Sequence, residues 1–404
     1  MRKILFIIPF FLWTCGGDES SPTEPSTLEI QHGKMYGGAG REIGRDVQAT
    51  SDGGFILAGY TDSFGSGGYD VYVVKTNASG SEMWSQTFGG SDDDIGQSIK
   101  ETSDGGFILA GQSRSFGAGG FDVYVVKTDA SGNEIWSQTF GGSAYDSAYS
   151  IEETSDGGYI IGGTTRPDEN EGRDMYLIKI DTSGNEIWSQ TFGEGGNGHD
   201  VAYSTKETLD GGFILAGFTE SSTTGAENMY LVKTNSSGNE MWSQILEVSS
   251  VCRSVEQTLD GGFILGCGMY LVKTDASGNE IWSQNFQGEV AGGDVAFYDL
   301  LKISDGGYIM AGYTQTDSFG HDMYVIKIDA SGSEMWRKTH GEESWLLSQN
   351  IQLMDPTFPS STTSEIAYSI DETSDGGFIL GGETSLVSRN MYLIKMDSEG
   401  NRIF

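Results

Sequence analysis

Apolar residues along this chain are arranged in short runs that predict β-strands. In a typical run, Val123 and Val125 lie on one side of an extended segment, and Tyr124 and Val126 lie on the other. Short segments that are apolar on both sides are typical of strands sandwiched between neighbouring sheets. The pattern therefore predicts many short strands that are covered on both faces.

The segment DGG followed by Phe or Tyr marks a repeat and occurs seven times. The copies begin at Asp52, Asp104, Asp156, Asp210, Asp260, Asp305 and Asp375. Most successive copies are 45 to 54 residues apart, and the last two are 70 apart. In the second copy, one turn at 104–105 and another at 130–133 separate two predicted hairpins. Four short strands repeated about every 50 residues are the pattern of a propeller blade.

We therefore predict an all-β fold, a seven-bladed β-propeller of four-stranded blades. Residues 35–38 correspond to residues 87–90 of the next copy, and the chain stops at Phe404, near the position of a repeated tryptophan. The N- and C-terminal segments should therefore share one blade, which closes the ring and removes free sheet edges. The expected boundaries are a signal peptide over 1–14, a polar tether with the start of the closing strand over 15–33, and the propeller over 34–404.

The N-terminal residues have the layout of a secretory signal. Arg2 and Lys3 precede an apolar run from Ile4 to Trp13, which is too short to cross a bilayer. With Leu12 three residues before Cys15, the segment resembles a lipoprotein signal peptide. That resemblance implies lipidation of Cys15 and a lipid-anchored protein of the outer membrane, facing the periplasm or the exterior. Ordinary signal-peptidase cleavage, with Cys15 incidental, stays as the alternative.

The charge of the chain argues against one class of partner. There are 58 acidic and 23 basic residues, for a formal net charge of −35. Such a surface repels phosphate backbones, so we expect no nucleic-acid binding. A solvated, self-repelling surface explains the charge without a specific cation site.

A tryptophan recurs near the end of six copies and is expected to be structural. We predict that each one packs between adjacent blades, and ligand stacking is the alternative. These residues are Trp84, Trp136, Trp188, Trp242, Trp282 and Trp336.

Three family resemblances follow from these motifs. A GG-x-x-x-D segment at 89–94, followed by the DG turn at 104–106, resembles the seven-bladed β-propeller repeats of secreted bacterial proteins. The turn before Trp136 is similar to the tryptophan-docking motif of quinoprotein alcohol dehydrogenases, which implies a docking role for Trp136 but no quinone. The run 228–232 is similar to strands of bulb-type lectins, although the mannose-binding motif of that family is absent.

The chemically active residue types form no motif. The histidines His32, His199, His321 and His340 show no metal-ligand spacing. A repeated aspartate before the third strand is predicted to cap a loop rather than to act as a catalytic acid. This aspartate occurs at Asp70, Asp122, Asp174 and Asp322. We expect no catalytic residues and no cofactor, and calcium binding by loop carboxylates stays open.

Cys252 and Cys267 flank the fifth DGG turn and should lie opposite one another in its hairpin. In an oxidising compartment this placement suggests a cross-strand disulfide, and two buried thiols are the alternative.

The DGG and ASGN turns hardly change between copies, whereas the other connections vary and should share the opposite face. An insert at 340–364 belongs to this variable set. We take this face as the candidate ligand face, and the insert as either a ligand contact or a lid on its own blade. Its candidate residues are Phe64, Phe116, Phe319, Trp345 and Phe358.

Three functions fit these observations. The first is a non-enzymatic binding or scaffolding propeller of the cell envelope, with a protein or glycan ligand on the variable face. The second is an extracellular carbohydrate-binding or carbohydrate-active protein, lectin-like or hydrolytic. The third, ranked last, is a quinoprotein-like redox enzyme.

Overall fold

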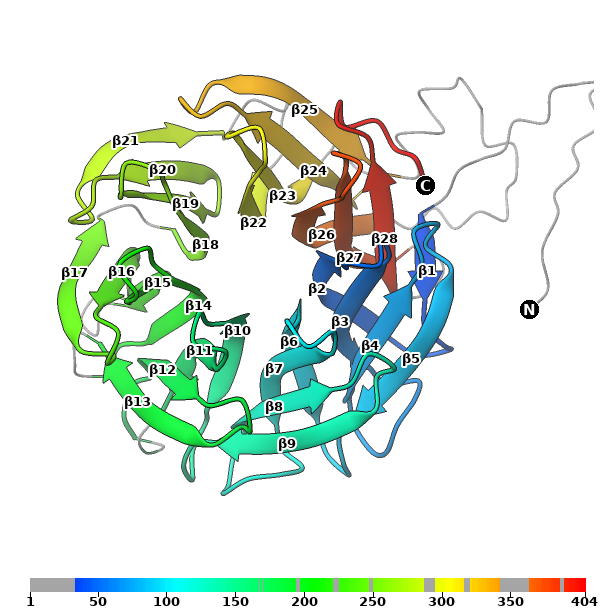
Figure 1. Ribbon diagram of the computed structural model, residues 1–404, viewed down its shortest axis with the longest axis horizontal. Helices are drawn as coiled ribbons and strands as arrows, with labels where there is room; N and C mark the ends of the chain where they lie inside the picture. The colour runs from blue at the N-terminus through cyan, green and yellow to red at the C-terminus, as the bar shows by residue number, and fades with distance from the viewer. Residues whose placement is uncertain are drawn as a thin grey trace, which may run out of the picture. The chain divides into compact units, whose positions relative to one another are not determined.

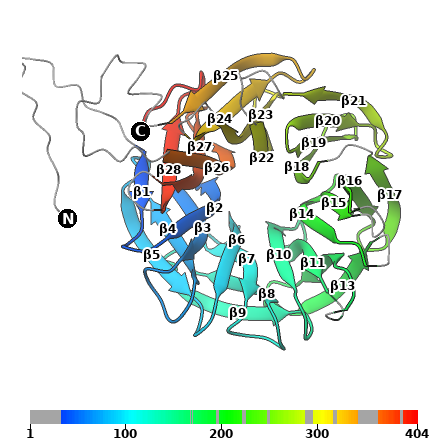
Figure 2. The same cartoon turned by 180° about the vertical axis from the view of Figure 1, so that it is seen from behind.

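The computed structural model describes residues 33–404 except 167, 169, 194–196, 221–224, 247–249, 287–294, 316–319, 342–362 and 386–388. In this part of the chain every regular element is a β-strand, and the strands form seven blades around one axis (Figures 1 and 2). This confirms the predicted all-β, seven-bladed propeller. The signal peptide and Cys15 lie outside the described residues.

The first four blades follow one another along the chain, each as an antiparallel sheet of four strands. Blade 1 contains β2 (Glu42–Ala49), β3 (Phe55–Thr61), β4 (Asp70–Thr76) and β5 (Glu82–Phe88). Blade 2 contains β6 (Asp94–Glu101), β7 (Phe107–Ser113), β8 (Asp122–Thr128) and β9 (Glu134–Phe140). Blade 3 contains β10 (Ser147–Glu153), β11 (Tyr159–Thr165), β12 (Asp174–Ile180) and β13 (Glu186–Phe192). Blade 4 contains β14 (Asp200–Glu207), β15 (Phe213–Glu220), β16 (Glu227–Thr234) and β17 (Glu240–Leu246).

The last three blades include the closure of the ring. Blade 5 contains β18 (Cys252–Gln257), β19 (Phe263–Cys267), β20 (Tyr270–Thr274) and β21 (Glu280–Asn285). Blade 6 contains β22 (Val295–Lys302), β23 (Tyr308–Gln315), β24 (Gly320–Ile328) and β25 (Glu334–His340). Blade 7 contains β26 (Thr363–Glu372), β27 (Phe378–Thr384), β28 (Asn390–Met396) and, from the start of the chain, β1 (Lys34–Tyr36).

Strand β1 pairs antiparallel with β28, with Met35 opposite Tyr392. The two ends of the chain therefore share blade 7, as predicted (Figure 1). A short parallel pairing between β24 and β26 also joins blade 6 to blade 7. The two blades therefore form one continuous eight-stranded sheet.

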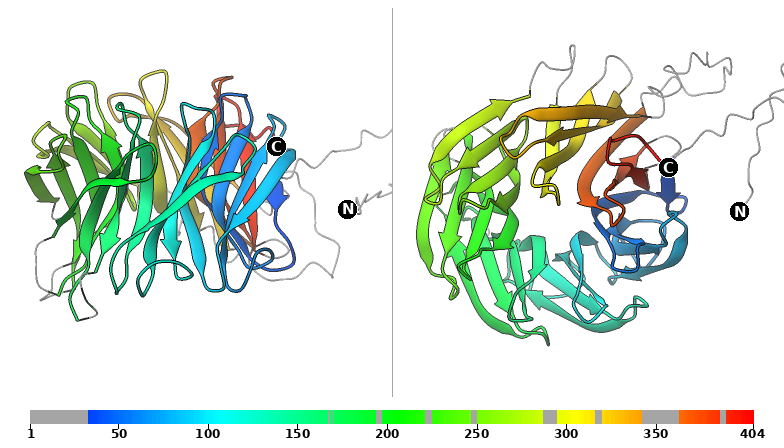
Figure 3. Two further views of the ribbon diagram at one scale, coloured as in Figure 1. Left: turned by 60° about the horizontal axis from the view of Figure 1, so that its bottom comes forward. Right: turned by 45° about the horizontal axis from the view of Figure 1, so that its top comes forward.

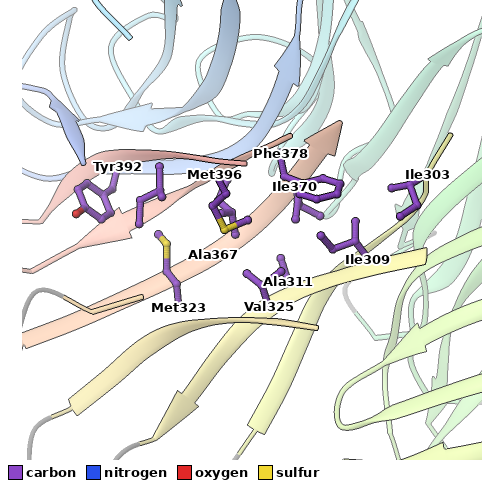
Figure 4. Packing of buried hydrophobic residues seen from close by; sticks show 12 residues of the cluster. Ile303, Ile309, Ala311, Met323, Val325, Ala367, Ile370, Phe378, Tyr392 and Met396 are labelled. Atoms are coloured by element: carbon purple, nitrogen blue, oxygen red, sulfur yellow. The ribbon is translucent and has the colours of Figure 1, made fainter. Parts of the chain in front are cut away.

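The core consists of apolar layers between neighbouring blades. Between blades 6 and 7, Met323 and Val325 of β24 share a buried cluster with Ala367, Phe378 and Met396 of blade 7 (Figure 4). Similar clusters occupy the boundaries between other blades. The second and third strands of a blade are buried on both sides for this reason, which explains their continuous apolar runs.

Each first strand contains a β-bulge opposite a glycine of the second strand. In blade 1 the register of β2 against β3 shifts between Gly44 and Asp46. A Cβ atom on Gly59 would lie 1.8 Å from the carbonyl oxygen of Ile43, so only glycine allows the two strands to approach this closely. The bulge turns the side chain of Arg45 toward the centre of the ring, where it lines a cavity.

The strands of each blade run between two faces of the ring (Figure 3). Because successive strands are antiparallel, the turns after the first and third strands share one face, which we call the turn face; in blade 1 they are residues 50–54 and 77–81. The connections after the second and fourth strands, such as 62–69 and 89–93, share the other face, which we call the loop face.

Candidate functional site: the axial cavity

The turn face carries an Asp–Lys ion pair that is repeated in all seven blades. In blade 1, Oδ1 of Asp52 accepts hydrogen bonds from Thr50 Oγ1 at 2.6 Å, from the Gly54 amide at 2.9 Å and from Lys75 Nζ at 2.9 Å. Partial burial opposes ionisation, but these donors lower the pKa of Asp52 to about 2. Every other DGG aspartate forms the same ion pair with the lysine of its third strand. A group present in every blade stabilises the blade and does not select a ligand.

The repeated tryptophans all occupy one kind of position on the outer strands. Trp84 lies 5.8 Å from the ring of Phe107 in the next blade, and a Cβ on Gly132 of that blade would lie 2.7 Å from its ring. Trp136, Trp188, Trp242, Trp282 and Trp336 lie equally close to a turn glycine of the following blade. Phe404 takes this position in blade 7, beside Phe55 and Gly80 of blade 1.

Cys252 and Cys267 are directly paired residues of β18 and β19 and are joined by a disulfide. Both are fully buried in an apolar cluster with Met229 and Leu231 of blade 4. The disulfide therefore joins the strands of the blade that has lost its loop between the second and third strands.

On the loop face, the repeated aspartates accept hydrogen bonds from loop amides. Asp70 accepts from the Ser66 amide at 2.8 Å, and Asp122 accepts from the Ala118 amide at 3.0 Å. Burial raises the pKa of both carboxyls. Phe64 is exposed and packs at 5.6 Å against Tyr72. Phe116 packs in the same way against Tyr124, while Phe319, Trp345 and Phe358 lie outside the described residues.

Among the described residues, no three His, Cys, Asp or Glu side chains are placed to share a metal ion. His199 accepts a hydrogen bond from the Arg173 amide, and His321 lies 3.3 Å from Ser364 Oγ. Burial, together with Arg402 and Lys338, lowers the pKa of His340 to about 4. His32 lies outside the described residues.

The candidate site is a cavity of about 460 Å³ on the axis of the ring, and all its lining residues in the described part of the chain belong to the innermost strands. These strands are β2, β6, β10, β14, β18, β22 and β26. The cavity has two levels, because the bulge residue of each strand lies nearer the loop face than the residue three positions later.

Charged side chains line the cavity toward the turn face, and we call them the charged ring. Lys100, Glu152, Lys206, Glu256 and Asp371 lie three positions after the bulge residue, and Asp46 and Asp299 lie one position after it. Lys206 Nζ lies 2.6 Å from Glu152 and 3.5 Å from Glu256, and Lys100 lies 3.6 Å from Asp46. Burial opposes the charge of Lys206, but the two glutamates raise its pKa. Both lysines are therefore cations with carboxylate partners.

Asp371 is one of the carboxyls of this ring with a raised pKa. Burial raises the pKa of Asp371 to about 6, against the opposing effect of the Ala49 amide and Lys100. Its Oδ2 accepts from the Ala49 amide at 2.9 Å, and its Oδ1 accepts from the Glu372 amide. The hydrogen bond from Ala49 joins blade 1 to blade 7 beside the cavity.

The level nearer the loop face is a chain of stacked aromatic and guanidinium groups, which we call the arginine–tyrosine belt. It consists of Arg45, Tyr368, Tyr298, Arg253, Tyr203 and Tyr149, in that order. Each neighbour lies between 4.7 and 4.9 Å from the next. These contacts combine cation–π and aromatic pairing, which hold the rings upright around the cavity.

Sequence reasoning missed this belt. Its members occupy one position per repeat, the residue before the serine or aspartate of the first strand, and differ from blade to blade. Comparing the seven repeats at this one position would have shown a set rich in arginine and tyrosine, residue types that often bind ligands. The residues at this position are Arg45, Gln97, Tyr149, Tyr203, Arg253, Tyr298 and Tyr368.

These features define a seven-bladed β-propeller with a polar axial cavity, and comparisons with known proteins agree with the fold. A family model described as "Outer membrane protein assembly factor BamB" matches residues 70–247, less than half of the chain. Regulatory protein FlaEY of Caulobacter vibrioides is 26% identical over 210 residues, which is 45% of this chain. The match spans only 22% of FlaEY.

Two solved propellers resemble the structure over most of its length. The WD40 domain of Neurospora crassa Pan2 has a TM-score of 0.52 and 10% identity, over 88% of this chain and 89% of that one. Raptor of Chaetomium thermophilum has a TM-score of 0.53 and 8% identity, over 90% of this chain and 29% of that one. Both likenesses concern the fold alone. In the described residues, no helix has the length and apolar content needed to span a bilayer.

Proposed function

We propose that this protein is a non-enzymatic binding propeller of the cell envelope that holds its ligand in the axial cavity from the loop face. The arginine–tyrosine belt is the observation that carries the proposal. It places two guanidinium groups and four tyrosines at the wall of a cavity of about 460 Å³, a size typical of small-ligand sites. The framework of the blades repeats the same residues, whereas the residues of the belt vary from blade to blade and can distinguish one ligand from another.

An envelope location is supported by two independent features. The first fifteen residues have the order of a lipoprotein signal, ending at Cys15. The matched family model is described as an outer membrane protein assembly factor. We therefore propose anchoring through a lipid on Cys15. Fractionation should place the wild-type protein in membranes and the Cys15→Ser variant in the soluble fraction, and equal membrane retention of both would exclude this anchor.

A glycoside hydrolase is the rival reading of the same cavity, because Asp371 has the raised pKa that a general acid needs. The contacts favour binding instead. Both oxygens of Asp371 accept backbone amides, and Glu152 is paired with Lys206. To act on a glycosidic oxygen, Asp371 would have to give up its hydrogen bond from Ala49 of blade 1, and Glu152 would have to give up its ion pair with Lys206 of blade 4.

The proposal is tested by blocking the cavity while leaving the belt in place. Gln97 lines the cavity at the belt level on β6, so Gln97→Trp should fill it. Gln138→Trp on the outer strand β9 is the matched control. On a glycan array and a peptide library, we expect the wild type and the control to retain the same ligand without converting it. Gln97→Trp should lose it.

Retention that survives Gln97→Trp in a folded protein would place binding elsewhere and overturn the proposal. Release of a cleaved sugar from a glycan would instead establish a glycoside hydrolase. If the wild-type protein binds nothing on the glycan array or in the peptide library, this result would also count against a binding role.

A further inference from the structure

Arg253 is held in place by stacking alone. Its guanidinium carbon lies 4.8 Å from the centre of the Tyr203 ring and 4.7 Å from that of the Tyr298 ring. Within the described part of the chain it has neither an ion pair nor a hydrogen bond. A guanidinium carries five N–H donors, and stacking on its faces leaves those donors directed along its edge. Arg253 lines the axial cavity, so its donors are available there.

Arg45, three blades away around the closed ring, also stacks on a tyrosine. It stacks at 4.7 Å over Tyr368, and its one hydrogen bond within the described residues is a long one of 3.4 Å to the Tyr60 hydroxyl. Its Nε is buried without a partner among the described residues. Buried donors without acceptors are costly, so Arg45 is short of an acceptor. Arg253 has no acceptor for its donors among the described residues.

The acids of the cavity are already engaged by other groups. Asp46 accepts from Ser98 Oγ at 3.0 Å, from the Ile99 amide at 2.9 Å and from Ser369 Oγ at 2.8 Å. Asp299 accepts from the amides of Leu300 and Ile370. These carboxylates join neighbouring blades and directly follow the belt residues Arg45 and Tyr298 in the sequence. Glu383 of β27 acts on the charge of Arg45 without a hydrogen bond to it among the described residues. The cavity carboxylates named above are engaged in contacts between blades, so a ligand can supply the acceptor at the arginine edges.

We propose that the arginine–tyrosine belt binds the carboxylate of an acidic sugar, a hexuronate unit of an oligosaccharide, through Arg45 or Arg253. This assignment rests on the proposed function, because it names the ligand class of the same cavity. The planar carboxylate matches the fork of a guanidinium and forms two parallel hydrogen bonds with it. The formal charge of −35 repels anions at long range, so only an anion that fits the belt is retained.

The surroundings of the arginines favour a sugar over a peptide. At the belt level the wall consists of tyrosines, the amide of Gln97 and the two guanidinium groups, with no aliphatic side chain. Such groups suit the hydroxyls and flat faces of a pyranose ring. An extended peptide would need a free strand edge or an apolar groove, and the amides of the innermost strands are engaged by the carboxylates of neighbouring blades.

The experiment compares ligands that differ only in the carboxylate. Dimers of galacturonate, glucuronate, mannuronate and guluronate, each beside its methyl ester, are titrated into the protein by calorimetry. We expect at least one dimer to bind about tenfold or more tightly than its ester. Arg253→Gln and Arg45→Gln should each be tested, and at least one should weaken that dimer about tenfold or more, with Arg253→Lys or Arg45→Lys restoring it in part.

The matched control is Arg114→Gln. Arg114 also stacks on an aromatic ring, 4.6 Å from Phe121, but it lies outside the cavity, so its substitution should leave uronate affinity unchanged. Thermal unfolding of each variant shows whether it is folded. If a variant does not fold, the wild-type protein's affinities for the uronate dimer and for its methyl ester still show whether binding depends on the carboxylate.

Equal affinity for acid and ester, or full binding by folded variants of both arginines, would overturn the inference. The inference would also be overturned if none of the uronate dimers binds.

If a neutral glycan binds the wild-type protein but not Gln97→Trp, the proposed function stands while the carboxylate assignment is wrong. Peptides with a free C-terminus and their amides form a separate arm. Binding of the free acid alone, without any uronate, would assign the belt to peptides and reject the sugar.

Discussion

The turn face and the axial cavity are built from the same seven repeats, but the turn face has the same pair of charged residues in every blade, whereas the cavity has different residues from blade to blade. On the turn face, the Asp–Lys ion pair recurs in every blade, from Asp52 with Lys75 to Asp375 with Lys395. In the cavity, the bulge position holds Arg, Gln or Tyr depending on the blade. Repetition thus marks the positions that stabilise each blade, and variation at equivalent positions marks those that can recognise an asymmetric ligand.

The largest effect is expected where a repeated residue links two blades. Trp84→Ala removes contacts with Phe107 and with the Gly132 turn of the next blade. We expect a loss of about 3 kcal/mol in the free energy of unfolding, because a large aromatic leaves a cavity behind. Urea denaturation measures this loss. Ligand binding by the folded variant should be unchanged, and lost binding at full stability would break the distinction between the two regions.

The disulfide of blade 5 should rank next. Replacing both Cys252 and Cys267 by serine removes a cross-link with a sequence separation of 15. We expect a loss of about 2.5 kcal/mol in the free energy of unfolding, mainly because the unfolded chain regains freedom. Urea denaturation of the wild type with and without reductant provides the comparison. A reductant that leaves the wild type unaffected while the double variant is destabilised would assign the loss to packing instead.

In the cavity, the pH dependence of stability should identify Asp371. Its folded-state pKa of about 6 lies above the unfolded value of about 4. The folded state therefore binds the proton more tightly, so this contribution is fully present below about pH 4 and is lost as the pH rises through 6. Asp371→Asn should remove this dependence, with a difference from wild type that changes by about 2 kcal/mol between pH 4 and 7.

Urea denaturation of both proteins at each pH measures this difference. Lys100 and Asp46 face the same carboxyl, and Glu256 and Asp299 also have raised pKa values. The difference between the two proteins isolates Asp371 from these neighbours. Parallel pH profiles for the two proteins would contradict the assignment.

The smallest effect is expected at a single turn-face ion pair. Asp104→Asn keeps an acceptor for the Gly106 amide but removes the charge opposite Lys127. Because Asp104 is largely exposed, we expect a loss of about 1 kcal/mol at neutral pH. The pKa of Asp104 is lowered to about 2. The contribution is therefore present above about pH 4 and disappears as the pH falls toward 2, which acid titration of stability would show.

The sequence predicted the parts of the molecule that recur. Seven DGG turns predict seven blades, and the homology of residues 35–38 with 87–90 predicts that β1 completes blade 7. The separation of Cys252 and Cys267 around a turn likewise suggests a cross-strand pair, and the structure places them opposite each other. Each of these inferences uses residues that are close in sequence or that share a motif.

The belt could not be predicted in the same way. Arg45 and Tyr368 are separated by most of the chain and meet only because the ring closes. Arg253 lies between tyrosines of the two adjacent blades, and no motif joins them. Variation along the sequence points to the loops, whereas the structure shows a second candidate site formed by one residue from each innermost strand.

Hydrogen–deuterium exchange with and without a ligand that the cavity-blocking comparison identifies tests the central claim most directly. The account predicts slower exchange in the innermost strands around the belt, above all in β2 and β18, and no change in the turns at 50–54 and 104–106. Protection confined to the turn face, with β2 and β18 unaffected, would contradict the assignment of binding to the axial cavity.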